Sequence, residues 1–203
     1  MVAREPDVIV LDKPAGWLVH PVGTDVPDLV TWARAEGLGR LRPAHRLDLD
    51  TSGLVVLART AAAAAAVGVE LMEGTVHKRY QALVYDVPDA EGVVELALAD
   101  ARRGRPLPAR TRWRCDERLG RFALLSLWPE TGRKHQLRRH LLAIGHPVVG
   151  DREYAVRPFR KVPGFPGRLW LHAAELRLAS GRGWSAPLPD VLVAHLALLR
   201  GGV

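Results

Sequence analysis

The chain has 203 residues, with 29 Lys and Arg against 22 Asp and Glu, a formal net charge of +7 and one cysteine, Cys115. We expect residues 1–203 to form one catalytic domain, although two small lobes around a cleft would also fit this length. No apolar run is long enough for a membrane span and no intramolecular disulfide is possible, so we expect a soluble protein of a reducing, cytoplasmic compartment. The basic balance favours a polyanionic partner such as RNA, the alternative being a surface that is basic only for solubility.

Apolar periodicity and turn residues predict the secondary structure. In chain order we expect a strand at 8–11, a helix at 29–36, a strand at 54–58, a helix at 61–72, strands at 78–85 and 123–128, a helix at 131–144, a strand at 170–178 and a helix at 191–199. The second helix has Thr60 as its predicted N-cap, an alanine run as its first turns, and Gly74 as its stop.

An arginine-rich stretch lies between Ala101 and Cys115. It carries Arg102, Arg103, Arg105, Arg110, Arg112 and Arg114, has no acidic residue, and is interrupted by Gly104, Pro106 and Pro108. We predict a basic loop that feeds a strand and does not easily pack as core. Two interpretations stay open: a solvated loop, or an RNA clamp, because arginines bind phosphates and stack on exposed bases.

The predicted helix at 131–144 places Leu137, Leu141 and Ile144 on one apolar face. It has no acidic residue, so Lys134, Arg138 and Arg139 are expected to present positive charge. His135 and His140 are not at the i, i+4 spacing of helical zinc ligands, so no metal site is predicted.

The most informative stretch is His45-Arg46-Leu47-Asp48-Leu49-Asp50-Thr51-Ser52-Gly53, which runs directly into the apolar strand at 54–58. A carboxylate between an imidazole and a guanidinium, next to a rigid strand, is typical of a positioned nucleophile or acid–base group. Asp48 is therefore the candidate. The alternative is a turn in which Asp48 or Asp50 caps backbone N–H groups and Arg46 pairs with one of them.

This stretch resembles the central motif of the RluA-type pseudouridine synthases, and that family's other motifs follow in the right order. They are Lys13-Pro14-Ala15-Gly16 with His20-Pro21, residues 78–84 (KRYQALV), residues 131–138 (TGRKHQLR), residues 146–151 (HPVVGD) with Tyr154, and Leu171-His172-Ala173. The family usually has Asn where Asp12 stands. The resemblance covers nearly the whole chain, and the first motif begins so early that we expect no S4-type RNA-binding module.

The resemblance implies an α+β fold in which a mixed, largely antiparallel sheet with flanking helices surrounds a basic active-site cleft. It implies a synthase that isomerises uridines of ribosomal or transfer RNA to pseudouridine without any cofactor or metal. Asp48 would be the catalytic carboxylate, paired with Arg138. Tyr80 would stack on the target base and assist proton removal from C5.

Further residues have implied substrate-binding roles. Arg46 would hold the rearranged RNA and Leu171 would form an apolar wall of the uracil pocket. The other implied RNA-binding residues are Arg133, Lys134 and His135. The expected partner is RNA, with no DNA or membrane partner, and the expected state is a monomer.

Two rival functions remain. The first is a non-catalytic RNA-binding protein with the same fold. The second is a metal-dependent phosphoesterase built on His45, Asp48 and Asp50, which a chelator would inactivate.

Overall fold

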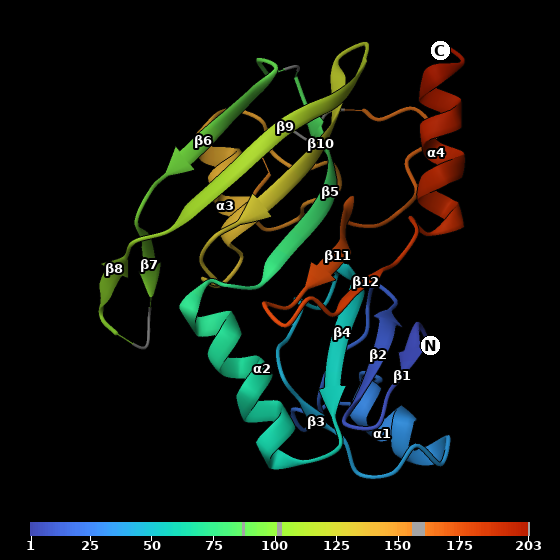
Figure 1. The fold of residues 1–203 in the computed structure, drawn as a ribbon. Coiled ribbons are helices and arrows are strands. Elements are labelled where there is room, and N and C mark those ends of the chain that lie inside the picture. Colours follow the sequence, from blue (N-terminus) through green and yellow to red (C-terminus); the bar gives the residue numbers. More distant parts are fainter. Residues whose placement is uncertain (87, 101–102, 156–160, 203) are drawn as a thin grey trace. The chain divides into compact units, whose positions relative to one another are not determined.

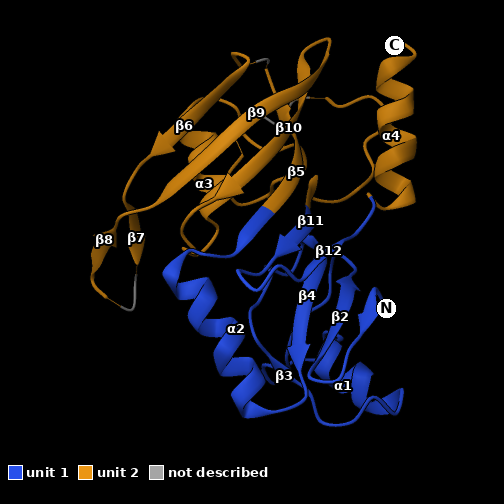
Figure 2. Ribbon diagram, viewed as in Figure 1, with its two compact units in different colours: residues 1–78, 173–187 blue, residues 79–172, 188–203 orange. Residues whose placement is uncertain are grey.

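The computed structural model describes residues 1–86, 88–100, 103–155 and 161–202. The chain forms two compact units, drawn in blue and orange in Figure 2. Unit 1 contains Met1–Lys78 and Ala173–Pro187, and unit 2 contains Arg79–His172 and Leu188–Val203. Two strands, β5 (His77–Tyr85) and β11 (Leu171–Arg177), have residues in both units.

Unit 1 is built on strands in the order β1-β2-β4-β11, with β3 beside β4 and β12 beside β11. The bounds are β1 Ala3–Arg4, β2 Val8–Lys13, β3 Arg42–Pro43, β4 Ser52–Ala58 and β12 Gly183–Ser185, with helices α1 Leu29–Ala35 and α2 Ala61–Glu73. The pairs β1–β2, β2–β4, β3–β4 and β11–β12 are antiparallel. Helix α2 packs against β3 and β4 (Figure 1).

Local chemistry explains both helices of unit 1. The Thr60 side chain accepts a hydrogen bond from the Ala63 N–H at 3.1 Å, and α2 ends at Gly74, whose φ of +73° suits a residue without Cβ. The Asp28 side chain caps α1 by accepting from the Thr31 N–H at 2.9 Å. The core of this unit includes Val10, Val56 and residues of the same sheet that are fully shielded from solvent.

Unit 2 contains an antiparallel sheet in the order β5-β10-β9-β6 and a separate two-stranded hairpin, β7–β8. The bounds are β6 Glu91–Glu95, β7 Leu98–Asp100, β8 Arg105–Leu107, β9 Arg110–Leu119, β10 Phe122–Pro129, α3 Gln136–Ala143 and α4 Asp190–Arg200. Helix α3 packs against β10 (Figure 1). Its Leu137 and Leu141 are buried with Trp170 and Leu192 in one core.

The prediction of a basic loop over the arginine-rich stretch is wrong for most of its length. Residues 105–107 form β8 and residues 110–115 belong to β9, while residues 101 and 102 lie outside the described part of the chain. Strand β9 alternates, with Thr111 and Trp113 buried and Arg112 exposed. The stretch packs as a sheet because alternate residues turn inward and acidic residues from outside it pair with the arginines.

Those acidic partners come from β6, from the residue that follows β10, and from β9 itself. Arg110 pairs with Glu95 and Glu130, Arg112 pairs with Glu130, and Arg114 pairs with Asp116. The guanidinium groups of Arg112 and Arg114 each lie 5.7 Å from the Trp128 ring centroid. Pairs across the sheet, together with the Arg114–Asp116 pair within β9, thus balance the positive charge of the stretch.

The third predicted helix begins at Gln136 rather than at Thr131. The Gln136 carboxamide oxygen accepts from the Thr131 hydroxyl at 2.7 Å and from the Arg133 N–H at 3.0 Å. These bonds hold residues 131–135 as a turn, in which His135 adopts the left-handed conformation with φ +54°.

The remaining predicted strands and helices are confirmed, with ends within two residues of those expected. The mixed α+β class with a largely antiparallel sheet is also confirmed. No helix among the described residues combines the length and apolar character that crossing a bilayer requires.

Candidate active site

Asp48 lies in a short turn between β3 and β4 of unit 1. The Thr51 N–H donates to the Asp48 carbonyl at 3.2 Å and closes the turn. Leu47 is 7% exposed, whereas Arg46 is exposed and Asp48 is half-buried. The buried Leu47 side chain thus holds the loop in place, while its two neighbours Arg46 and Asp48 are accessible to solvent.

The Lys13 side chain is hydrogen-bonded to the backbone of this loop. Its Nζ donates to the carbonyl oxygens of Pro14 at 3.0 Å, Trp17 at 2.7 Å and Leu49 at 2.9 Å, and the side chain is fully buried. The Gly16 N–H donates to the same Leu49 oxygen at 2.9 Å. Two motifs that are far apart in the sequence therefore meet at the residue that follows Asp48.

His45 fastens the start of the loop to β4. Its Nε2 accepts a hydrogen bond from the Val56 N–H at 3.1 Å, which requires this nitrogen to be unprotonated. Burial, with the nearby charge of Lys78, lowers the pKa of His45 to about 4. The imidazole is therefore neutral near pH 7 and its Nε2 is already engaged, which disfavours its use as a metal ligand.

Gly53 ends the loop where β4 approaches β11. Its φ is +115°, and a Cβ at this position would lie 2.3 Å from the Ala173 carbonyl oxygen. Only glycine satisfies both the backbone conformation and the close approach.

In unit 2, Arg138 is on α3 with 7% of its side chain exposed, so the prediction that it presents surface charge is wrong. Its Nε donates to Asp151 Oδ2 at 2.7 Å and its Nη2 donates to Asp151 Oδ1 at 2.8 Å. Nη2 also lies 3.4 Å from Glu153 Oε2, and the guanidinium carbon is 4.8 Å from the Tyr154 ring centroid. The segment after Gly150 therefore surrounds this arginine.

Asp151 is the buried partner of Arg138, with none of its side chain exposed. Its Oδ1 also accepts from the backbone N–H groups of Glu153 at 2.9 Å and Tyr154 at 2.8 Å. Burial alone raises the pKa of Asp151, but the hydrogen bonds from Arg138, Tyr154 and Glu153 outweigh it, so the pKa is lower than usual. The carboxylate is therefore ionised near pH 7.

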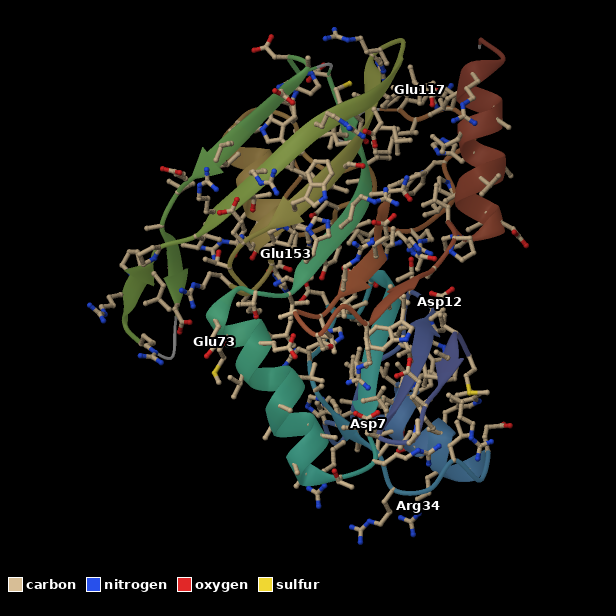
Figure 3. The ribbon with its side chains drawn as sticks, viewed as in Figure 1. Asp7, Asp12, Arg34, Glu73, Glu117 and Glu153 are labelled. Atoms are coloured by element: carbon tan, nitrogen blue, oxygen red, sulfur yellow. The ribbon has the colours of Figure 1, made fainter. Side chains whose placement is uncertain are left out.

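The turn before α3 carries three residues with predicted RNA-binding roles. Arg133 Nε donates to the Pro108 carbonyl at 3.1 Å, which ties this turn to the end of the β7–β8 hairpin, and Lys134 is exposed. His135 Nδ1 lies 3.1 Å from the Tyr154 hydroxyl and 3.3 Å from Glu153 Oε2. Glu153, labelled in Figure 3, thus contacts both His135 and Arg138.

Tyr80 and Leu171 belong to the core of unit 2. Tyr80 is half-buried on β5, opposite Leu127 of β10, and packs at the edge of this core. Leu171 is 3% exposed at the start of β11. The Tyr80 ring and the Leu171 side chain therefore belong to one hydrophobic cluster.

The structure places Arg46 and Asp48 on one loop of unit 1, and in unit 2 it brings Arg138 and His135 to the same partner, Glu153. The predicted pair of Asp48 with Arg138 joins residues of different units and stays a prediction. Sequence reasoning assigned no role to Lys13 or Asp151. Two features of the sequence could have indicated them. Lys13 follows the apolar run Val8–Leu11 by two residues, and Asp151 comes directly after a glycine in the motif at 146–151.

Comparison with known proteins gives consistent matches. A family model described as RNA pseudouridylate synthase matches residues 7–143. The chain is 36% identical to ribosomal large subunit pseudouridine synthase D of Nitrosomonas europaea, over 97% of the chain and 64% of that protein. It is 34% identical to dual-specificity RNA pseudouridine synthase RluA of Vibrio parahaemolyticus, over 87% of the chain and 76% of that protein.

Among solved structures, human RNA pseudouridylate synthase domain containing 4 superposes with a TM-score of 0.81 at 26% identity, covering 98% of this chain and 92% of that one. The chain spans just under two thirds of the Nitrosomonas relative's own length.

Proposed function

This chain belongs to the RNA pseudouridylate synthase family, and we propose that it isomerises uridine to pseudouridine in RNA, with Asp48 as the catalytic carboxylate. The observation that carries this proposal is the family match over residues 7–143, which includes the Asp48 loop. The buried Lys13 supports it, because its hydrogen bond to Leu49 fixes the backbone next to Asp48, and an acid–base or nucleophilic group must be held in a defined position.

The reaction breaks the N1–C1′ bond, turns the detached uracil, and joins C5 to C1′. The C5 proton then leaves and N1 ends protonated, so substrate and product contain the same atoms and no electrons are exchanged. Asp48 would act beneath the sugar, by adding to the substrate or by stabilising oxocarbenium character, as carboxylates do in glycosidases. An isomerisation of this kind asks for no redox cofactor.

The other site residues support this chemistry in the proposal. Arg138 would be a further catalytic residue, and Tyr80 would stack on the uracil and assist removal of the C5 proton. Leu171 would line the uracil pocket. Arg46, exposed two residues before Asp48, would hold the RNA after the target nucleotide leaves its stack, which costs a few kcal/mol.

The β7–β8 hairpin is the proposed RNA-contacting part of the arginine-rich stretch. Arg103 and Arg105 are exposed on it. Its base is held by Arg139 Nη1, which donates to the Ala99 carbonyl at 3.1 Å, and by Arg133 Nε on Pro108. A hairpin that carries exposed arginines and is fastened at its base suits phosphate contact, together with Lys134 and His135 on the adjacent turn.

The proposed substrate is ribosomal or transfer RNA. The Nitrosomonas relative is named for the large ribosomal subunit, the Vibrio relative for dual specificity, and a Pectobacterium relative for tRNA. We propose that the protein acts as a monomer in the cytoplasm, without a DNA or membrane partner.

The test is tritium release from RNA labelled at C5 of uridine, using unmodified ribosomal and transfer RNA. Wild type should release tritium with or without chelator, and Asp48→Asn should lose about 10³-fold or more of the rate while binding RNA as wild type does. Asp50→Asn is the matched control, because Asp50 is exposed in the same loop and should retain activity.

Two results would reject the proposal. Absence of release from every RNA pool, despite tight and salt-sensitive binding, would indicate the non-catalytic RNA-binding protein. Release of nucleotide fragments that stops with chelator would indicate the phosphoesterase.

A further inference from the structure

Asp151 binds Arg138 in a way that sets the orientation of the guanidinium plane. Oδ2 receives Nε and Oδ1 receives Nη2, at 2.7 and 2.8 Å. Two parallel bonds along one edge of the guanidinium fix its rotation as well as its distance. The Tyr154 ring, 4.8 Å from the guanidinium carbon, adds a second contact to the group.

The backbone in turn fixes Asp151. The N–H groups of Glu153 and Tyr154 both donate to Oδ1, and the Asp151 N–H donates to the Val148 carbonyl at 3.2 Å. Gly150 precedes it with φ +79°, and a Cβ there would lie 2.3 Å from the Arg168 carbonyl oxygen. The carboxylate therefore has a defined position that does not depend on Arg138.

Stability alone is a weak reason for such a pair. Removing two charges from water costs free energy that their attraction often only offsets, and apolar replacements of buried ion pairs are often neutral or stabilising. A buried pair with backbone support is better explained by the orientation that it imposes.

We infer that Asp151 is a positioning residue, which fixes the orientation of the Arg138 guanidinium for the part that this arginine takes in the reaction. This inference rests on the proposed function. It assigns the segment Gly150–Tyr154 to the catalytic machinery through Arg138, and it gives Asp151 no contact with the RNA.

The test is a double-mutant cycle with Asp151→Asn and Arg138→Lys. Asparagine keeps the oxygen that receives the two backbone N–H groups, but turns an NH₂ group toward Arg138 Nε, so it breaks one specific bond. We expect Asp151→Asn to lower the single-turnover rate about 100-fold, as expected for a misplaced catalytic group, with the RNA Kd within about 2-fold of wild type. Because Asp151 acts through Arg138, the double variant should be no slower than Arg138→Lys alone.

Leu192→Ala is the matched stability control, since this apolar side chain is fully buried on α4 in the same core. It should lower Tm without lowering the single-turnover rate of the folded protein. If Asp151→Asn does not fold, Asp151→Ser replaces it in the cycle, because its hydroxyl still accepts from the backbone N–H groups.

Additive losses in the cycle, or a loss in Asp151→Asn that Leu192→Ala reproduces at equal Tm, would overturn the inference. The Arg138 Nε–H NMR resonance, assigned by its absence from Arg138→Lys, separates this failure from failure of the proposed function. Slow hydrogen exchange in wild type and fast exchange in Asp151→Asn would support positioning even if no RNA released tritium. Equal exchange in the two proteins would reject it.

Discussion

Lys13 Nζ donates to the carbonyl oxygen of Leu49 at 2.9 Å, across 36 positions of the sequence. The bond connects the end of β2 to the residue that follows Asp48. It makes the conformation of the loop depend on a side chain that is fully buried.

Lys13→Met should destabilise the protein by about 3 kcal/mol, because it removes three hydrogen bonds from a fully buried side chain and leaves the Pro14 and Trp17 carbonyl oxygens without this donor. Tritium release should fall at least as steeply, since the Asp48 loop loses its support. Urea unfolding and the release assay measure the two effects. Arg34→Met is the charge-matched control, because Arg34 is exposed on α1 (Figure 3). Unchanged stability and activity in Lys13→Met would show that the loop does not need this lysine.

Gly53→Ala should cost about 3 kcal/mol or more, because it combines a left-handed backbone with a backbone contact 2.3 Å from the new Cβ. Gly68→Ala is the opposite case. Gly68 is within α2, and among the described residues no heavy atom beyond its chain neighbours and the nearby helix backbone lies within 4 Å of the place its Cβ would take, so alanine should stabilise by about 1 kcal/mol. Thermal unfolding of both variants checks the contrast, and equal Tm shifts would contradict it.

His45 should make stability depend on pH. Its folded pKa of about 4 is below the unfolded value of 6.5, so the unfolded chain binds the proton more readily between these values. The contribution is fully present above pH 6.5 and is lost as pH falls toward 4, by about 3 kcal/mol. Urea unfolding from pH 7.5 to 4.5 measures it. His45→Gln, which keeps an acceptor for the Val56 N–H, should lose less stability over this range, and an identical slope would reject the assignment.

Arg103 and Arg105 should contribute to RNA affinity through phosphate contacts. The double change to Gln should reduce the slope of log K against log salt by about 1 to 2. Binding titrations at several salt concentrations measure the slope. The matched control is Arg112→Gln with Arg114→Gln, which removes the same charge from arginines that already pair with Glu130 and Asp116. A larger effect in the control would place the RNA on the face of β9 instead.

Local patterns in the sequence were sufficient for most of the secondary structure. The Thr60 cap, the alanine run and Gly74 predict the two ends of α2, which runs from Ala61 to Glu73, and the apolar run at 54–58 is a buried strand. Such signals depend on propensity and on neighbours in the chain, which do not change when the chain folds. The Asp48 turn was predictable for the same reason, and its motif was sufficient to indicate the family.

Tertiary structure alone decided which charges are paired. Arg112 meets Glu130 because β9 and β10 pair in one register, and Arg138 is buried because Asp151 reaches it from the segment after α3. Lys13 likewise became a support for the Asp48 loop only through its contact with Leu49. Charge pairing and burial depend on groups brought together from distant positions, so composition and spacing along the chain predict the charged residues but not their partners.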